Sequence, residues 1–218
     1  MTDLLETTFQ RETAFAGGFE DYTRRLERFD SRLIEIAARA WMQDKDDDRT
    51  FPDYVATLER YDVNLVDAAA RLWPHDDTNK RTFPDYVDRL RRYDFTLVDI
   101  AARLWPQDMA NRRQFPDYVE ALKRYESQLT DTAARLWIQD KANRRTFPEY
   151  VDTLERYDFT LVDLAARMWP QDTANRRHFP DYVEALSKSP VPAILSAADA
   201  WEQDGRRTSL PDFVAQLR

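Results

Sequence analysis

The chain of 218 residues contains no cysteine, only three glycines and only two histidines. The absence of cysteine excludes disulfides, thiol nucleophiles and thiolate zinc sites. The scarcity of glycine argues against strands joined by tight turns and against phosphate-cradling loops, because both use glycine for positive φ. His75 and His178 lie far apart in the chain and have no evident partner for catalysis or metal ligation. We therefore expect no catalytic site, no cofactor and no metal.

A surplus of basic residues is also lacking. The chain has 32 Lys and Arg against 40 Asp and Glu, a formal net charge of -8. This charge disfavours general binding of polyanions, which is driven by surplus Lys and Arg. No apolar run approaches the length of a membrane span, and the segment 1–6 lacks the basic and long apolar stretches of a secretion signal. We expect a cytoplasmic protein with no membrane partner.

What the chain does contain is a repeat of 32 residues. The motif Phe-Pro-(Asp/Glu)-Tyr-Val begins at Phe51 and returns at the same step four more times. A unit this short cannot bury a core of its own, so it must stack on its neighbours, as solenoid repeats do. One tryptophan per repeat keeps the same step and forms a structural signature: Trp41, Trp73, Trp105, Trp137, Trp169 and Trp201.

Each repeat reads as two amphipathic helices. In the repeat 50–81, apolar residues fall at helical spacing over about 52–60 (helix A) and again over about 63–73 (helix B). The apolar stripe alone would also fit one long helix. The sixth repeat decides between them, because its segment 189–192 reads Ser-Pro-Val-Pro, and each proline would cost about 3 kcal/mol inside a helix. We therefore predict a break in every repeat.

The predicted fold is all-α: one α-solenoid domain, 1–218, of six helical-hairpin repeats. The chain order is a degenerate B helix, six A-B hairpins and a final A helix. We expect an open, curved, monomeric array, with a closed ring and head-to-tail assembly as the two alternatives. The boundaries are 1–17 for the degenerate N-terminal cap, 18–49, 50–81, 82–113, 114–145, 146–177 and 178–208 for the repeats, and 209–218 for the terminal half repeat.

Acidic residues before and inside the helices have structural interpretations. Asp62 and its counterparts Asp30, Asp94 and Asp158 are placed to cap the B helices. Thr50 and Asp53 form a capping pattern for helix A, with proline in the first turn. Asp67 and Arg71 stand four apart on helix B, and this spacing predicts an ion pair that returns in three further repeats.

A hairpin of about this length resembles the tetratricopeptide and related α-solenoid modules. The resemblance concerns shape alone, since the Trp, Leu-Gly and Tyr spacing of tetratricopeptide repeats is not reproduced. It implies a stacked helical array and assigns no binding residue.

The strongest candidate for function is the loop after each helix B, where an Asp follows the Trp by three positions and basic residues close the loop. On a structural interpretation, which we favour, the Trp covers the core while Asp and Arg bond each other or loop carbonyls. On a functional one, the arginines bind phosphates or carboxylates and the Trp faces stack on a ligand. The arginine pairs are Arg112, Arg113, Arg144, Arg145, Arg176 and Arg177.

Two other features were weighed as sites. The acidic stretch 44–48 could attract a divalent cation, but it lacks the spacing, turn glycine and distal glutamate of a calcium loop, so we expect a solvated loop. Positions on helix A that differ between repeats could encode a partner or could vary without consequence, and we slightly favour the second. They include Asp88, Arg89, Glu120 and Asp152.

These patterns predict a non-catalytic scaffold that binds a protein or peptide, or that serves in assembly. The alternative is a nucleic-acid binder that uses the loop arginines and tryptophans. An enzyme ranks third, because no nucleophile and base, metal cluster or phosphate loop can be assembled from the residues.

Overall fold

The computed structural model describes residues 2–12, 15–77, 79–141 and 143–217, and these form helices joined by loops and turns, without a strand. The A helices are α2 (Phe19–Leu26), α4 (Phe51–Leu58), α6 (Phe83–Leu90), α8 (Phe115–Leu122), α10 (Phe147–Leu154), α12 (Phe179–Ser187) and α14 (Leu210–Gln216). The B helices are α1 (Thr2–Arg11), α3 (Ser31–Trp41), α5 (Val63–Leu72), α7 (Phe95–Leu104), α9 (Ser127–Gln139), α11 (Phe159–Met168) and α13 (Val191–Gln203). Neighbouring helices pack in pairs, so the predicted all-α array of helical hairpins is confirmed.

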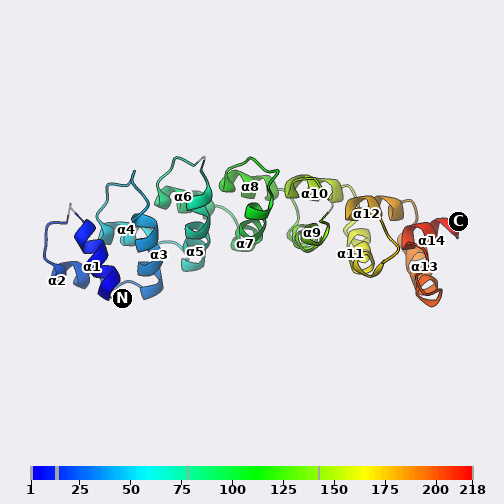
Figure 1. Cartoon of the computed structure of the whole chain (residues 1–218), viewed down its shortest axis with the longest axis horizontal. Helices are drawn as coiled ribbons and strands as arrows, with labels where there is room; N and C mark the ends of the chain where they lie inside the picture. The colour runs from blue at the N-terminus through cyan, green and yellow to red at the C-terminus, as the bar shows by residue number, and fades with distance from the viewer. Residues whose placement is uncertain (1, 13–14, 78, 142, 218) are drawn as a thin grey trace. The chain divides into compact units, whose positions relative to one another are not determined.

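The chain divides into two compact units, each described here by itself. The first unit comprises Met1–Arg103 with Arg113–Glu120, and the second comprises Leu104–Arg112 with Ala121–Arg218. In the first unit α2, α4 and α6 pack along one layer, and α3 and α5 along another (Figure 1). In the second unit α10, α12 and α14 form the A layer, and α9 packs on α11 in the B layer (Figure 1).

The predicted break between helices A and B is present in every repeat, and aspartates cap the second helix. The carboxylate of Asp62 accepts hydrogen bonds from the backbone N–H groups of Asn64 (2.8 Å) and Leu65 (3.4 Å). Asp30, Asp94 and Asp158 accept equivalent bonds. In the sixth repeat Pro190 precedes α13 and Pro192 lies in its first turn. The backbone N–H groups of a first turn have no partner inside the helix, so the N–H that proline lacks is not missed there.

The core is built from the apolar face of helix A. Phe51, Tyr54, Val55 and Leu58 are fully buried, and their counterparts from α6 to α12 are buried equally. The first alanine of each helix B pair is also fully buried in the internal repeats, as at Ala69. A side chain of this size lets neighbouring helices approach closely, so large and small residues interdigitate across the layers.

The N-terminal helix α1 is the predicted degenerate B helix. Its Phe9 ring lies edge-on at 5.5 Å from Phe19 in the following helix A. Trp41 lies at the same 5.5 Å from Phe51, so Phe9 takes the place of the signature tryptophan. None of the helices described is both long and apolar enough to cross a membrane.

Candidate binding surface: the loops between repeats

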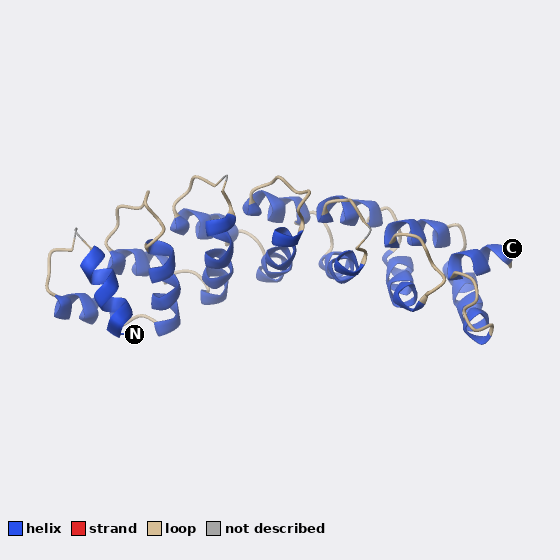
Figure 2. Cartoon of the chain, viewed as in Figure 1, coloured by secondary structure: helices blue, strands red, loops and turns tan. Residues whose placement is uncertain are grey.

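The long loops that follow the B helices stand along one edge of the first unit (Figure 2). In three loops the first turn after helix B is a 3-10 helix: η1 (Trp73–His75), η2 (Trp105–Gln107) and η3 (Trp169–Gln171). The loops after α7, α9 and α11 contain every residue of the arginine pairs predicted as candidates. Their geometry separates residues that hold the array together from residues left free to bind a partner.

The signature tryptophans are structural. The indole N–H of Trp137 donates to the carbonyl of Arg145 (3.2 Å), and its ring lies edge-on against Phe147, with centroids 5.9 Å apart. Trp41, Trp73 and Trp169 make the same two contacts in their own repeats. The indole N–H and one aromatic contact of each of these tryptophans thus close the loop on the next helix A.

The aspartate three positions after the tryptophan has a role that the sequence did not indicate. Asp44 is 6% exposed, and its Oδ2 accepts a hydrogen bond from the backbone N–H of Phe83 at 2.6 Å. Phe83 begins the helix A that lies two repeats further along the chain. The remaining carboxylates of this kind make the same bond at 2.7–2.9 Å: Glu12 with Phe51, Asp76 with Phe115, Asp108 with Phe147, Asp140 with Phe179, and Asp172 with Leu210.

These bonds provide an acceptor for the first backbone N–H group of helix A. The first N–H groups of a helix have no partner inside it, and here the first of them belongs to a fully buried phenylalanine. The capping threonine serves only the third position, as Thr50 does for Asp53 (3.4 Å). The distant carboxylate supplies the acceptor that water cannot supply, and we call each such contact a carboxylate rung.

A buried tyrosine completes the rung in the first unit. The hydroxyl of Tyr54 donates to Oδ2 of Asp44 (3.2 Å), and Tyr86 donates to Asp76 (3.3 Å). Burial raises the pKa of Asp44, although the bonds from Phe83 and Tyr54 oppose this effect. Burial, followed by the neighbouring carboxylate of Asp44, also raises the pKa of Tyr54.

The second arginine of a loop pair is bound within the chain. Arg177 contacts Asp212 at 2.7 Å and the hydroxyl of Ser209 at 3.1 Å, both at the start of α14. Arg145 lies 3.6 Å from Asp181 in α12. The sequence predicted that the loop Asp and Arg bond each other or loop carbonyls. In these repeats the Asp binds a helix N–H and the second Arg binds a helix carboxylate, whereas the predicted bond to loop carbonyls is made by Arg176.

The arginine three positions before the next helix A is exposed to solvent in the loops of the second unit; it is the first arginine of its pair at Arg112, Arg144 and Arg176, and the second at Arg207. In the part of the second unit that the structure describes, Arg112, Arg144 and Arg207 are exposed and form no ion pair. Arg176 is exposed too, and its Nη1 donates to the carbonyls of Thr173 (3.0 Å) and Asn175 (3.1 Å) in its own loop. We name Arg112, Arg144, Arg176 and Arg207 the cation row.

Little exposed negative charge opposes the cation row. The aspartates of the second-unit loops are the buried rung residues, apart from the exposed Asp204. The loops of the first unit differ, because exposed Lys45, Lys80 and Arg81 alternate with exposed Asp46 and Asp77. The structure therefore concentrates unopposed positive charge on the loops of the second unit, although the whole chain is acidic.

The variable helix A residues contact side chains of the neighbouring repeat. Tyr61 donates its hydroxyl to Asp88 (2.9 Å), and Tyr93 donates to Glu120 (2.7 Å). Arg124 contacts Asp152 at 2.7 Å in the second unit. Arg89 pairs with Asp117 in the first. Each of the candidates Asp88, Arg89, Glu120 and Asp152 thus has a partner inside the chain, and their role in binding another protein stays a prediction.

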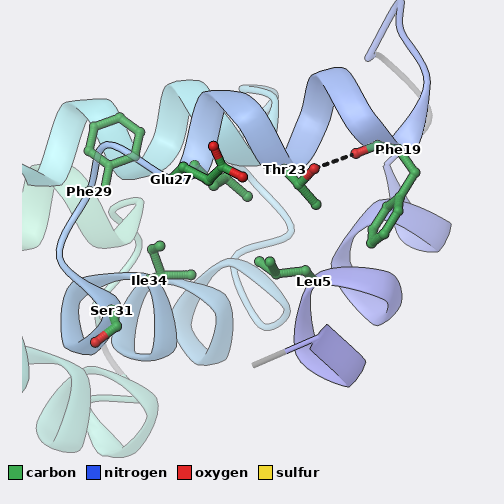
Figure 3. Close-up of a pocket in the computed structure, with 8 residues that line it drawn as sticks. Leu5, Phe19, Thr23, Glu27, Phe29, Ser31 and Ile34 are labelled. Atoms are coloured by element: carbon green, nitrogen blue, oxygen red, sulfur yellow. Dashed lines mark hydrogen bonds between the residues drawn. The ribbon is translucent and has the colours of Figure 1, made fainter.

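Two hollows were considered as ligand sites. The first, of about 350 Å³, lies among α1, α2 and α3, with Leu5, Phe19 and Ile34 around it (Figure 3). Its Thr23 hydroxyl donates to the carbonyl of Phe19 (3.1 Å), so the lining offers mainly apolar surface (Figure 3). The second, of about 290 Å³, lies between two loops of the second unit and is lined largely by polar and charged residues.

The acidic residues and the two histidines do not form a metal site in the part of the chain that the structure describes. Among the residues described, no three His, Asp or Glu side chains are grouped so as to hold a metal ion. In the acidic stretch 44–48, Asp44 is a carboxylate rung and Asp47 forms an ion pair with Arg49. His75 is exposed, whereas Nδ1 of His178 lies 2.9 Å from Oδ1 of Asp140.

Comparison with known proteins finds no family model, curated protein or solved structure that matches the chain.

Proposed function

We propose that the protein is a non-catalytic scaffold that binds an acidic segment of a partner protein along the cation row. The observation that carries the proposal is the row itself. It supplies one exposed guanidinium group from each loop of the second unit, on a frame fixed by buried rungs. Guanidinium groups bind carboxylates with paired, charge-assisted hydrogen bonds.

The spacing of the repeats suits an extended peptide. Successive loops of the second unit touch, since Arg206 donates to Oε1 of Gln171 at 3.0 Å. Packed helices lie about 8–10 Å apart, which corresponds to about three residues of an extended chain at about 3.3 Å each. An acidic side chain at every third position of a peptide would therefore meet one arginine of the cation row.

The same contacts disfavour nucleic acid as the partner. Base stacking requires free aromatic faces, but the indoles pack against helix A phenylalanines. The second arginines are neutralised by Asp181 and Asp212. The few loop cations without an ion pair in the described part of this acidic chain give little counterion release, which is the main driving force for binding a phosphate backbone.

The experiment compares two labelled peptides, (Glu-Ser-Ala)4 and (Gln-Ser-Ala)4, by fluorescence anisotropy at low salt. We expect the glutamate peptide to bind at least about tenfold more tightly, and the triple change Arg112→Gln, Arg144→Gln and Arg207→Gln to remove that preference. The matched control changes Lys45, Lys80 and Arg81 of the first unit to Gln and should leave binding intact.

Equal binding of both peptides by the wild-type protein would refute the proposal. Tighter binding of single-stranded DNA than of the glutamate peptide would instead favour the nucleic-acid alternative. We propose the cytoplasm as the compartment and a monomer as the working form, and a mass that rises with protein concentration would identify head-to-tail assembly.

A further inference from the structure

We infer that the hollow between the loop after α9 and the loop after α11 is a binding site for a single oxyanion group, with His178 as its selective contact. This inference rests on the proposed function in one respect: in a bound acidic segment, the group would be a Glu or Asp carboxylate.

The hollow lies between two consecutive loops and is open to solvent. Gln139 at the end of α9 and Asp140 and Lys141 in the loop after it line one side, and Trp169 and 175–178 line it from the loop after α11. Its volume of about 290 Å³ accommodates one side chain of a peptide. Because it lies beside Arg176, it is continuous with the cation row.

His178 distinguishes this hollow from its counterparts. The other repeats place Gly18, Thr50, Thr82, Gln114, Thr146 or Ser209 before helix A. The imidazole Nδ1 is held 2.9 Å from Oδ1 of Asp140, which is 5% exposed. When the ring is protonated, both ring nitrogens donate, so an imidazolium bonded to the carboxylate at Nδ1 presents its Nε2–H to a ligand; about a third of this side chain is exposed.

Two cations from different loops complete the site. Lys141 is exposed, and the described residues provide no ion pair for it. Arg176 is positioned by its Nη1 bonds to Thr173 and Asn175, which leave its other guanidinium nitrogens for a ligand. An ammonium and a guanidinium on two sides of a hollow of this size suit one oxyanion between them.

The two carboxylates in the wall are occupied as acceptors. Asp140 accepts from the N–H of Phe179 (2.9 Å) in addition to its contact with His178. Asp172 accepts from the N–H groups of Asn175 (3.0 Å) and Leu210 (2.8 Å). Their oxygens are therefore committed to the frame, and the donors that remain for a ligand come from Lys141, Arg176 and His178.

The test observes the imidazole directly. The chain has two histidines, so ring carbon–proton NMR spectra of wild type and His75→Gln assign both signals. We expect the (Glu-Ser-Ala)4 peptide, and sodium acetate at the same ionic strength as a sodium chloride control, to shift the His178 signal and leave His75 in place. His178→Thr, which restores the residue of other repeats, should weaken the glutamate peptide about tenfold and leave the glutamine peptide unchanged.

The possible outcomes separate this inference from the proposed function. Tight binding of the glutamate peptide with an unmoved His178 signal and an unaffected His178→Thr variant would refute the oxyanion site while the scaffold proposal stands. A His178 shift with acetate, in a protein that binds neither peptide, would support the site and refute the scaffold proposal. If acetate and both peptides leave the signal unchanged, the site is refuted.

Discussion

Asp44 and Phe83 are joined by a hydrogen bond of 2.6 Å from the backbone N–H of Phe83 to the carboxylate of Asp44, across 39 positions of sequence. Helix α4 lies between these two residues in the sequence. Its Tyr54 hydroxyl donates to the same oxygen of Asp44. One carboxylate thus fixes parts of three repeats. This contact distinguishes the array from a stack held together by apolar packing alone.

The first prediction concerns this carboxylate. Asp44→Ala should lower the free energy of unfolding by about 1–3 kcal/mol, because it leaves the buried N–H of Phe83 without an acceptor. Urea denaturation measures the change. The matched control is Asp46→Ala, two positions away at an exposed site, which should stay within about 0.5 kcal/mol of wild type. Equal effects of the two changes would contradict a structural role for the rung.

The tryptophans provide a second prediction. Trp137→Ala should cost about 3 kcal/mol, because it removes both the ring contact with Phe147 and the bond to the carbonyl of Arg145. Trp137→Phe keeps an aromatic ring and loses only the hydrogen bond, so it should cost about 1 kcal/mol. Native emission should be blue-shifted relative to the unfolded chain, and unchanged stability in Trp137→Ala would contradict this role.

The two arginines of one loop should have different effects when changed: Arg177 should affect stability and Arg176 should affect peptide binding. Arg177→Gln breaks the contact with Asp212 and should destabilise the second unit by about 0.5–1 kcal/mol at most, since the pair is partly exposed. Arg176→Gln should leave the free energy of unfolding unchanged and weaken the glutamate peptide. Thermal unfolding and anisotropy, measured on both variants, check the assignment, and a reversal of the two effects would show it to be wrong.

The buried tyrosines predict how the stability of the fold depends on pH above neutrality. Burial and the hydrogen bond to Glu120 raise the pKa of Tyr93 from 10.0 to about 12, and burial raises those of Tyr54 and Tyr86 further. Below pH 10 the hydroxyls are protonated in both folded and unfolded chains. Above pH 10 the unfolded chain ionises first, so stability should fall progressively as pH rises toward 12. Absorbance at 295 nm should show tyrosine ionisation coincident with unfolding, whereas free titration near pH 10 would contradict the burial.

The helices and the repeat boundaries could be predicted from sequence because their causes are local. The spacing of Phe51, Tyr54 and Leu58 identifies a helix face, and the prolines at 190 and 192 identify the break between helices. The aspartate caps also lie within three residues of the groups they bind. Each of these signals can be recognised in a short window of sequence.

The candidate site was only partly predictable because its deciding contacts join residues that are far apart in the sequence. The loop arginines were identified as candidates, but Arg176 and Arg177 look equivalent in sequence, and only the position of Asp212 distinguishes them. The carboxylate rung spans one repeat plus seven residues, so no local pattern indicates it. The residue before helix A could have drawn attention to the hollow, since His178 stands where Thr is usual, but its contact with Asp140 depends on the stacking.

The reach of the rungs sets a minimum size for cooperative folding. The rung of Asp44 begins in the repeat 18–49 and ends in the repeat 82–113, so a fragment of two repeats contains no complete rung. The stability of shortened arrays should therefore rise more steeply at the third repeat than a sum over adjacent pairs would give, because coupling extends to the second neighbour. A one-residue insertion in a single loop would displace the carboxylate from its target, whereas duplication of a whole 32-residue repeat would preserve every register.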